Sequence, residues 1–317
     1  MPRAIGANCR LLMLPEVTYG TAPASNWRRM PFLSCDLGAE QPLLDADVIG
    51  VGSNRDPAAP FLDTVTVAGQ AVVPVDLVNT GHWLRLLLGA PTTTGTTNFI
   101  HTFGSGAASL PSNAMEIGYP DVPSFDVCTG VRADTLELDF TPTGAATATF
   151  GLMGQGSVRT GATSGGTPTS AAYTAFNKAQ GAISRNGSAL AQVTGARLTY
   201  ANGMEMVRTI RADRKVEGVD PGIARATGQI TARFADTTLL TQAQNNAPAE
   251  FAFSYTIDAN RSLTFTLHEV YLALAKTPVE GPGGVEASFE FRAAYNAAAT
   301  RMMTAVLNNS QAGTEYG

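Results

Sequence analysis

Side chains capable of catalysis or metal binding are present in this sequence, but their spacing favours no reaction. The three histidines, His82, His101 and His268, lie far apart, and no cysteine or acidic residue stands near them at the spacing of a metal-ligand motif. Isolated histidines of this kind are typical of surface or half-buried positions. We therefore expect no metal site and no cofactor.

The carboxylates likewise favour a solvated sheet face over acid–base catalysis. Asp134, Glu137 and Asp139 lie in or beside a segment in which polar and apolar residues alternate, as do Asp45 and Asp47 in an earlier segment. In such a strand the outward face must be polar whether or not it reacts. Paired carboxylates here do not indicate a glycosidase-type pair.

Nucleophile and phosphate-binding motifs are absent from the sequence as well. It contains no G-x-S-x-G elbow. The Gly-rich stretches at 104–109 and 280–286 lack the lysine and the strand-to-helix setting of a phosphate loop, and both are typical of turns. We expect no catalytic residues, and the protein is predicted not to be an enzyme.

The composition argues against further classes of protein: nucleic-acid-binding, disulfide-stabilised and membrane-spanning proteins. In 317 residues there are 32 Gly and 18 Pro, 15% charged residues and a net charge of −5. With this net charge the chain has no excess of basic residues that could neutralise the phosphates of a nucleic acid. The cysteines, Cys9, Cys35 and Cys128, are odd in number and widely spaced, so we expect them reduced and buried. No apolar run is long enough for a membrane span, and the first residues do not resemble a signal peptide.

One compact basic cluster stands out, formed by Arg208, Arg211, Arg214 and Lys215. It lacks the interleaved aromatic residues of a single-strand nucleic-acid platform. Complementarity with an acidic surface on a neighbouring copy is the favoured interpretation, and a nucleic-acid patch remains the alternative.

The elements that would position these side chains come in two copies. Residues 43–76 predict a strand, a polar loop and a second strand, and residues 201–236 repeat that scheme. Arg55 to Gly69 and Arg214 to Gly228 have the same spacing, with Asp-Pro in both loops.

A short helical segment follows each pair, at 77–89 and at 237–246, and two alternating strands close each copy. In these closing strands we align Leu136 with Val270. The Thr- and Gly-rich stretch 92–112 is predicted to be an insertion that only the first copy has. We expect it to form a loop on the exterior of the assembly.

These patterns predict a mainly β fold with two tandem antiparallel β-sandwich or half-barrel units, each carrying a short α-helix. The first unit covers residues 1–156 with an N-terminal arm, and the second covers 181–317. Residues 157–180, poor in large apolar side chains, are expected to form a flexible linker or an extended arm.

The order and spacing of several segments resemble a known family. They are 17–23 (VTYGTAP), 45–57 (DADVIGVGSNRDP), 73–77 (VPVDL), 115–140 (MEIGYPDVPSFDVCTGVRADTLELDF), 176–188 (FNKAQGAISRNGS), 227–236 (TGQITARFAD) and 281–291 (GPGGVEASFEF). Together they are similar to the major tail tube proteins of long-tailed bacteriophages, in the duplicated form of that family. The resemblance spans nearly the whole chain.

The resemblance implies a structural virion protein whose rings stack into the hollow conduit for viral DNA. Single-unit members form six-membered rings, so a duplicated chain would form a trimer with pseudo-sixfold symmetry. The implied location is the virion tail, after synthesis in the host cytoplasm. The implied partners are copies of the chain itself and the tape measure, terminator and distal-tail proteins. Viral DNA would pass without specific binding, and no membrane partner is expected.

The same resemblance implies roles for individual residues. The strand-connecting loops at 52–61 and 212–223 would reach the adjacent ring, and the N-terminal arm and linker would lock rings or subunits together. Within the loops the inter-ring candidates are Asn54, Arg55, Asp56, Pro57, Arg214, Lys215, Glu217 and Asp220. The lumen-facing acidic candidates are Asp45, Asp47, Asp63 and Asp76. Trp27 and Trp83 are expected to be core residues or interface anchors.

Two other functions stay open on the sequence alone. A distal-tail or tail-terminator protein of the same fold lineage would form one ring and never a filament. A carbohydrate-binding β-sandwich would need a clustered aromatic platform, whereas the 8% aromatic residues are dispersed along the chain.

Overall fold

The computed structural model describes residues 3–49, 56–279 and 281–317, and in them the chain is mainly β with two α-helices. The strands up to residue 160 are β1 (Arg10–Pro15), β2 (Arg28–Met30), β3 (Ser34–Cys35), β4 (Gly38–Glu40), β5 (Leu43–Leu44), β6 (Phe61–Leu62), β7 (Thr66–Pro74), β8 (Thr92–Thr94), β9 (Phe99–Gly104), β10 (Asn113–Tyr119), β11 (Ser124–Phe140), β12 (Thr147–Gly154) and β13 (Gly156–Thr160).

The later strands are β14 (Thr169–Ser170), β15 (Gly181–Arg185), β16 (Ser188–Ala189), β17 (Val193–Ala201), β18 (Glu205–Val207), β19 (Gly218–Asp220), β20 (Arg225–Arg233), β21 (Ala249–Asp258), β22 (Arg261–Leu272), β23 (Glu286–Ala293) and β24 (Met303–Asn309). The α-helices are α1 (Asn79–Leu88) and α2 (Thr238–Gln244), and the short 3₁₀ turns are η1 (Gly6–Asn8), η2 (Lys178–Gln180) and η3 (Gly313–Glu315).

The long strand β11 belongs to two sheets. Its first half pairs with β10 and β13, and β10 continues the sheet through β1 and β2. Its second half pairs with β12 and β17 in a larger sheet. The change occurs near Gly130, whose φ of 65° is left-handed and whose added Cβ would come within 3.0 Å of Tyr19 and Gln155. A glycine is therefore required where β11 passes from one sheet to the other.

Two sets of strands show the same pairing order. In the first set β10, β11, β12 and β7 are successive neighbours, and in the second set β21, β22, β23 and β20 are. Each set places its helix after β7 or β20, as the sequence predicted. Outside these strands, β3 and β4 pair with β7, and β17 pairs with β20.

The ladders correct one alignment made from the sequence. Leu136 lies opposite Phe150, which lies opposite Ala71 of β7. In the second set, Phe289 lies opposite Ile230 of β20. The β22–β23 ladder ends with Leu272 opposite Phe291, the N–H of Ala273 still donates to Glu290, and extending this register by one more residue would bring Leu274 to Phe289. Leu274, rather than Val270, is thus the counterpart of Leu136, because the two hairpins differ in length.

The two sets join inside the chain through the antiparallel ladder between β11 and β17, in which Leu136 lies opposite Tyr200. Arg197 of β17 forms an ion pair with Glu137 of β11. Beneath the ladder, Phe140 stacks on Tyr255 with ring centroids 4.8 Å apart. Backbone, charge and core contacts therefore all cross this junction.

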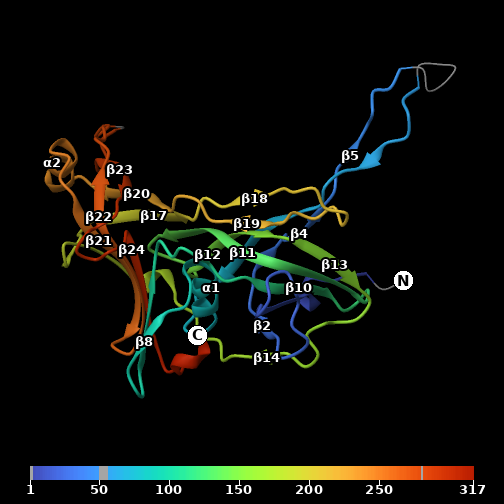
Figure 1. Cartoon of the computed structure of the whole chain (residues 1–317). Helices are drawn as coiled ribbons and strands as arrows, with labels where there is room; N and C mark the ends of the chain where they lie inside the picture. The colour runs from blue at the N-terminus through green and yellow to red at the C-terminus, as the bar shows by residue number, and fades with distance from the viewer. Residues whose placement is uncertain (1–2, 50–55, 280) are drawn as a thin grey trace.

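Helix α1 lies inside the molecule, beneath the sheet of β11 and β12 (Figure 1). All its residues are buried except Arg85, which is half-buried. Trp83 is 1% exposed and stacks on Phe150 at 4.9 Å, and Trp27 is 0% exposed in a separate small cluster. Both tryptophans are core residues of this chain, and neither has surface left for an interface.

The 92–112 stretch differs from the exterior loop that we expected. It forms β8 and β9, and β9 pairs along its whole length with β24. Phe103 of β9 is fully buried. Between α2 and β21 the second set has no equivalent strands, which agrees with an insertion in the first.

Residues 157–180 run along the first set and are held at several points. Part of the segment lies in β13, paired with β11, and β14 runs parallel to β2. Phe176 is 1% exposed, and its N–H donates to the carbonyl of Val75 at 2.9 Å. These contacts fix the path of the chain between the two sets.

Candidate assembly surfaces

The hairpin of β5 and β6 projects from the body of the molecule (Figure 1). We call residues 43–62 the first arm. Its strands pair only with each other, Leu43 opposite Leu62 and Leu44 opposite Phe61. Of the inter-ring candidates, Asn54 and Arg55 lie outside the described residues, and Asp56 and Pro57 are exposed on this arm.

The first arm exposes large apolar side chains on both faces. They are Leu43 (65% exposed), Leu44 (41%), Val48 (58%), Ile49 (100%), Phe61 (52%) and Leu62 (45%). Contiguous apolar surface of this kind marks an interaction site. The sequence signal was the pair of apolar dipeptides at 43–44 and 61–62, which do not alternate as a half-buried strand would.

The lumen-facing carboxylate candidates occupy different environments. Asp45 and Asp47 are exposed on the first arm, and Asp63 lies at its base, where its N–H donates to the carbonyl of Pro42. They belong to the projecting hairpin and not to the inner sheet. Asp76 is fully buried, so it cannot face a lumen.

Asp76 instead caps α1. Its carboxylate accepts hydrogen bonds from the backbone N–H groups of Val78 (2.7 Å) and Asn79 (2.6 Å). These are donors that the helix cannot satisfy itself. Burial raises the pKa of Asp76, although these hydrogen bonds act in the opposite direction. Its role is structural.

The counterpart hairpin, β18 and β19, lies along the body and not away from it (Figure 1). We call residues 205–220 the second arm. Val216 and Val219 are buried, Arg132 donates to the carbonyl of Val219, and Gln155 Nε2 donates to the carbonyl of Glu217 at 2.8 Å. The second arm is therefore docked on the first set of strands.

The tip of the second arm also meets the base of the first. The N–H of Val65 donates to the carbonyl of Arg214 at 2.9 Å, and Val65 bridges to Lys215. The candidates Arg214, Glu217 and Asp220 are exposed on this arm, and Lys215 is half-buried. Their surroundings are thus largely the chain itself.

The basic cluster of the second arm is partly neutralised within the arm. Arg211 Nη2 lies 2.9 Å from Asp213 Oδ2, and Nη1 lies 2.8 Å from Glu217 Oε2. The hydrogen bond from Arg211 lowers the pKa of Asp213 well below its usual range. Fewer positive charges are left for an acidic partner or a nucleic acid than the sequence suggested.

Several strand edges of the larger sheet are open among the described residues: β8 pairs only with β9 and β16 only with β15, and two further edges bear on assembly. One is the outer edge of β3 and β4, since these strands pair only with β7. The other follows the end of β22, where the N–H of Ala273 donates to Glu290 of β23, so that the N–H of Leu274 faces away from β23. Leu274 is 66% exposed. Open edges with exposed apolar residues are templates for strand addition.

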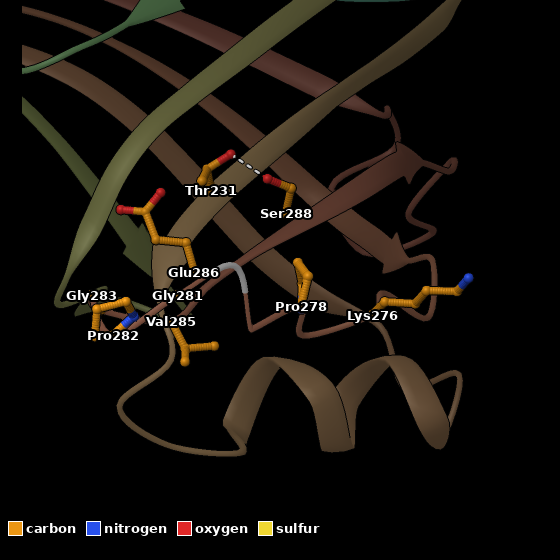
Figure 2. Close-up of a pocket in the computed structure, with 10 residues that line it drawn as sticks. Thr231, Lys276, Pro278, Gly281, Pro282, Gly283, Val285, Glu286 and Ser288 are labelled. Atoms are coloured by element: carbon orange, nitrogen blue, oxygen red, sulfur yellow. Dashed lines mark hydrogen bonds between the residues drawn. The ribbon is translucent and has the colours of Figure 1, made fainter.

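A hollow of about 620 Å³ lies beside this second edge, between β20, β23 and the loop that follows β22. Figure 2 shows Thr231 and Ser288 pointing toward each other from adjacent strands, with their hydroxyls 2.7 Å apart. Lys276 and Glu286 are the charged groups among its described lining residues. Such a set offers no nucleophile paired with a base.

Histidines and cysteines form no reactive site in the described chain. His82 and His101 are buried, and His268 Nε2 lies 2.8 Å from Thr304 Oγ1. No group of three or more potential metal ligands occurs in residues 3–49, 56–279 and 281–317. Cys128 is buried, which raises its pKa to about 11. Cys9 and Cys35 are partly exposed, contrary to the expectation that all three cysteines are buried.

Comparison with protein-family models identifies the family of this chain. A family model described as "Phage tail tube protein" matches residues 6–293. No curated protein matches the sequence. In the part of the chain that the structure describes, neither helix is long and apolar enough to cross a membrane.

Proposed function

Because this chain belongs to the phage tail tube protein family, we propose that it is the major tail tube subunit, whose rings stack into the conduit for viral DNA. A tail tube protein is a structural component of a phage tail. The proposal further names a ring of three chains, each contributing two tandem units that meet at the β11–β17 ladder. The main support for this proposal is that two open strand edges correspond, by their position in the repeat, to the two strands of that ladder. The edge of β3 and β4 corresponds to β17, and the edge after β22 corresponds to β11.

The equivalence follows from the registers. Inside the chain Leu136 lies opposite Tyr200, and Tyr200 lies opposite Ala226 of β20. Ala39 lies opposite Val67 of β7, the residue that corresponds to Ala226 in the duplicated pattern. Leu274 and Ala39 are therefore the counterparts of Leu136 and Tyr200. We infer that Leu274 of one chain lies opposite Ala39 of the next.

Strand addition at these edges closes the ring. Each chain has one edge of each kind, so the contact is head to tail, and a head-to-tail contact with the right rotation closes on itself. Closure covers Leu274 and pairs the two edges with each other. Since each chain carries two units, three chains supply the six units of the simple family ring.

The sheet face opposite α1 suits the lumen. Its side chains are mainly hydroxyls, with one amide, three carboxylates and two guanidinium groups. They are Thr135, Glu137, Asp139, Thr147, Thr149, Arg197, Thr199, Thr227, Gln229, Thr231, Ser288, Glu290 and Arg292. A face without a net positive field releases few counterions from DNA, so the polyanion can slide. We assign the lumen to this face and not to the arm carboxylates.

Stacking is assigned to the first arm. It projects beyond the body, and its apolar side chains have no partner in the described part of the chain. The next ring supplies the surface that covers them. The tape measure, terminator and distal-tail proteins would bind at the inside and the two ends of the stack, in a particle assembled in the host cytoplasm.

Electron microscopy of the purified protein at rising concentration tests this function. We expect hollow filaments whose end-on averages have threefold symmetry, because hydrophobic stacking of closed rings is cooperative. Rings that never stack would instead indicate a terminator or distal-tail protein. A protein that stays monomeric at high concentration would contradict the assignment.

A further inference from the structure

A polar cavity of about 240 Å³ lies between α1, the end of β1 and the last residues of the chain. We call it the α1 cavity. Its polar lining includes Arg28, His82, Arg85, Asn113 and Glu315. The share of liquid volume taken by one water molecule is about 30 Å³, so the cavity accommodates a polyatomic guest. None of its described lining residues belongs to either arm or to the two strand edges proposed to close the ring.

Arg85 is the group in this cavity that needs a partner. Its Nε and Nη1 atoms are buried and make no hydrogen bond, and no carboxylate lies within ion-pair distance of it in the described residues. Buried N–H groups of a guanidinium that have no hydrogen-bond acceptor are costly. Burial lowers the pKa of Arg85, in keeping with that cost.

Asn113 adds a second unpartnered group. It is 2% exposed, and its Oδ1 atom has no hydrogen-bond partner. An amide side chain presents both an acceptor and an NH₂ donor. The buried amide of Asn113 and the half-buried guanidinium of Arg85 therefore leave polar atoms of β10 and α1 that the described chain does not satisfy.

The other charged groups do not neutralise Arg85. Glu315 is ion-paired with Arg28. His82 Nε2 lies 3.3 Å from the same carboxylate, but burial, the larger effect, lowers the pKa of His82 and favours the neutral ring. With Arg28 and Glu315 paired and His82 neutral, Arg85 is left without an ion-pair partner among the described residues.

We propose that the α1 cavity binds a small oxyanion, phosphate or a carboxylate, on the guanidinium of Arg85. A planar guanidinium binds both kinds of oxyanion through paired N–H groups. The bound anion supplies the counter-charge that α1 lacks and joins that helix to the C-terminal residues 313–317. The ligand stabilises the subunit and takes no part in stacking.

Isothermal titration calorimetry and thermal unfolding of the full chain test the site. Inorganic phosphate and acetate are titrated separately, each against sodium chloride of equal ionic strength. We expect at least one of them to bind and to raise Tm above the chloride control. Arg85→Gln is expected to weaken that binding tenfold or more, whereas Arg214→Gln, a change at an exposed loop arginine, leaves it unchanged.

A second measurement on the unaltered protein tests the same proposal even if the Arg85→Gln variant does not fold. Crystals of the unaltered protein soaked in sodium selenate are expected to show anomalous density within hydrogen-bond distance of the Arg85 guanidinium. The proposal is overturned if neither anion binds beyond chloride, or if both arginine variants respond alike. Selenate density found only elsewhere on the molecule also overturns it.

Discussion

Rings that no longer stack are the expected result of the double substitution Ile49→Asp and Phe61→Asp in the first arm. Both side chains are at least half exposed in the single chain and would be covered in the tube. Burial of such a side chain contributes about 2 kcal/mol, and 1.4 kcal/mol is a tenfold change in affinity, so the concentration needed for stacking should rise about a thousandfold. Sedimentation of filaments at graded concentrations measures this.

A matched control lies on the same arm. Asp45→Asn with Asp47→Asn changes two charges and leaves the apolar surface intact, so filaments are expected at a nearly unchanged concentration. Threefold rings should persist in both double variants, because the substituted residues lie on the projecting hairpin and not on the strand edges that close the ring. If the variant with Ile49→Asp and Phe61→Asp still formed filaments at the original concentration, stacking by the first arm would be ruled out.

Ring closure itself is expected to fail in the variant Leu274→Pro. The N–H of Leu274 makes no hydrogen bond within the described chain and faces the open edge. Proline removes that donor, and its ring blocks the approach of another strand. The contact between chains also lacks the ion pair that Arg197 and Glu137 provide inside the chain, which makes the backbone ladder more important.

Analytical ultracentrifugation should then find this variant as a monomer at concentrations where the unaltered protein is assembled. Leu274→Ala retains the N–H and loses only the side chain, so it should assemble with reduced affinity. A native circular dichroism spectrum for both variants separates a lost contact from a lost fold. Trimers of the proline variant would show that this edge is not part of the ring.

The sequence predicted those features that depend on local pattern and spacing. Alternation in β11 and β12 predicted sheet faces, and the apolar run ending at Gly89 predicted the helix found at Asn79–Leu88. The shared spacing from Arg55 to Gly69 and from Arg214 to Gly228 predicted the repeated strand order. Each of these signals lies within a short stretch of chain.

Features that depend on distant partners could not be predicted in this way. The 92–112 stretch is Thr- and Gly-rich, yet it forms strands because β24, about two hundred residues later in the chain, provides an edge for β9. Asp76 follows the end of a strand, which suggested a lumen position, but α1 begins three residues later, and the backbone N–H groups of Val78 and Asn79 hold its carboxylate inside. Burial at such positions is decided by tertiary contacts.

The C-terminal residues illustrate the same limit. Tyr316 is fully buried against α1, and its hydroxyl donates to the carbonyl of Val78 at 2.8 Å. A Cβ atom at Gly81 would come within 2.4 Å of its ring, so glycine is needed in that helix for close approach. A lone tyrosine near Gly and Thr carries no pattern from which this packing could be inferred.

The most direct test of the ring is disulfide cross-linking of the double variant Leu274→Cys with Ala39→Cys. Residues directly opposite in an antiparallel pair have Cα atoms about 4.5–5.5 Å apart, within the range that a disulfide spans. After mild oxidation, we predict a denaturing-gel ladder that ends at the covalent trimer, and no ladder for either single variant. Absence of cross-linking, or a ladder that continues past three chains, would contradict a closed ring built by repeating the internal junction.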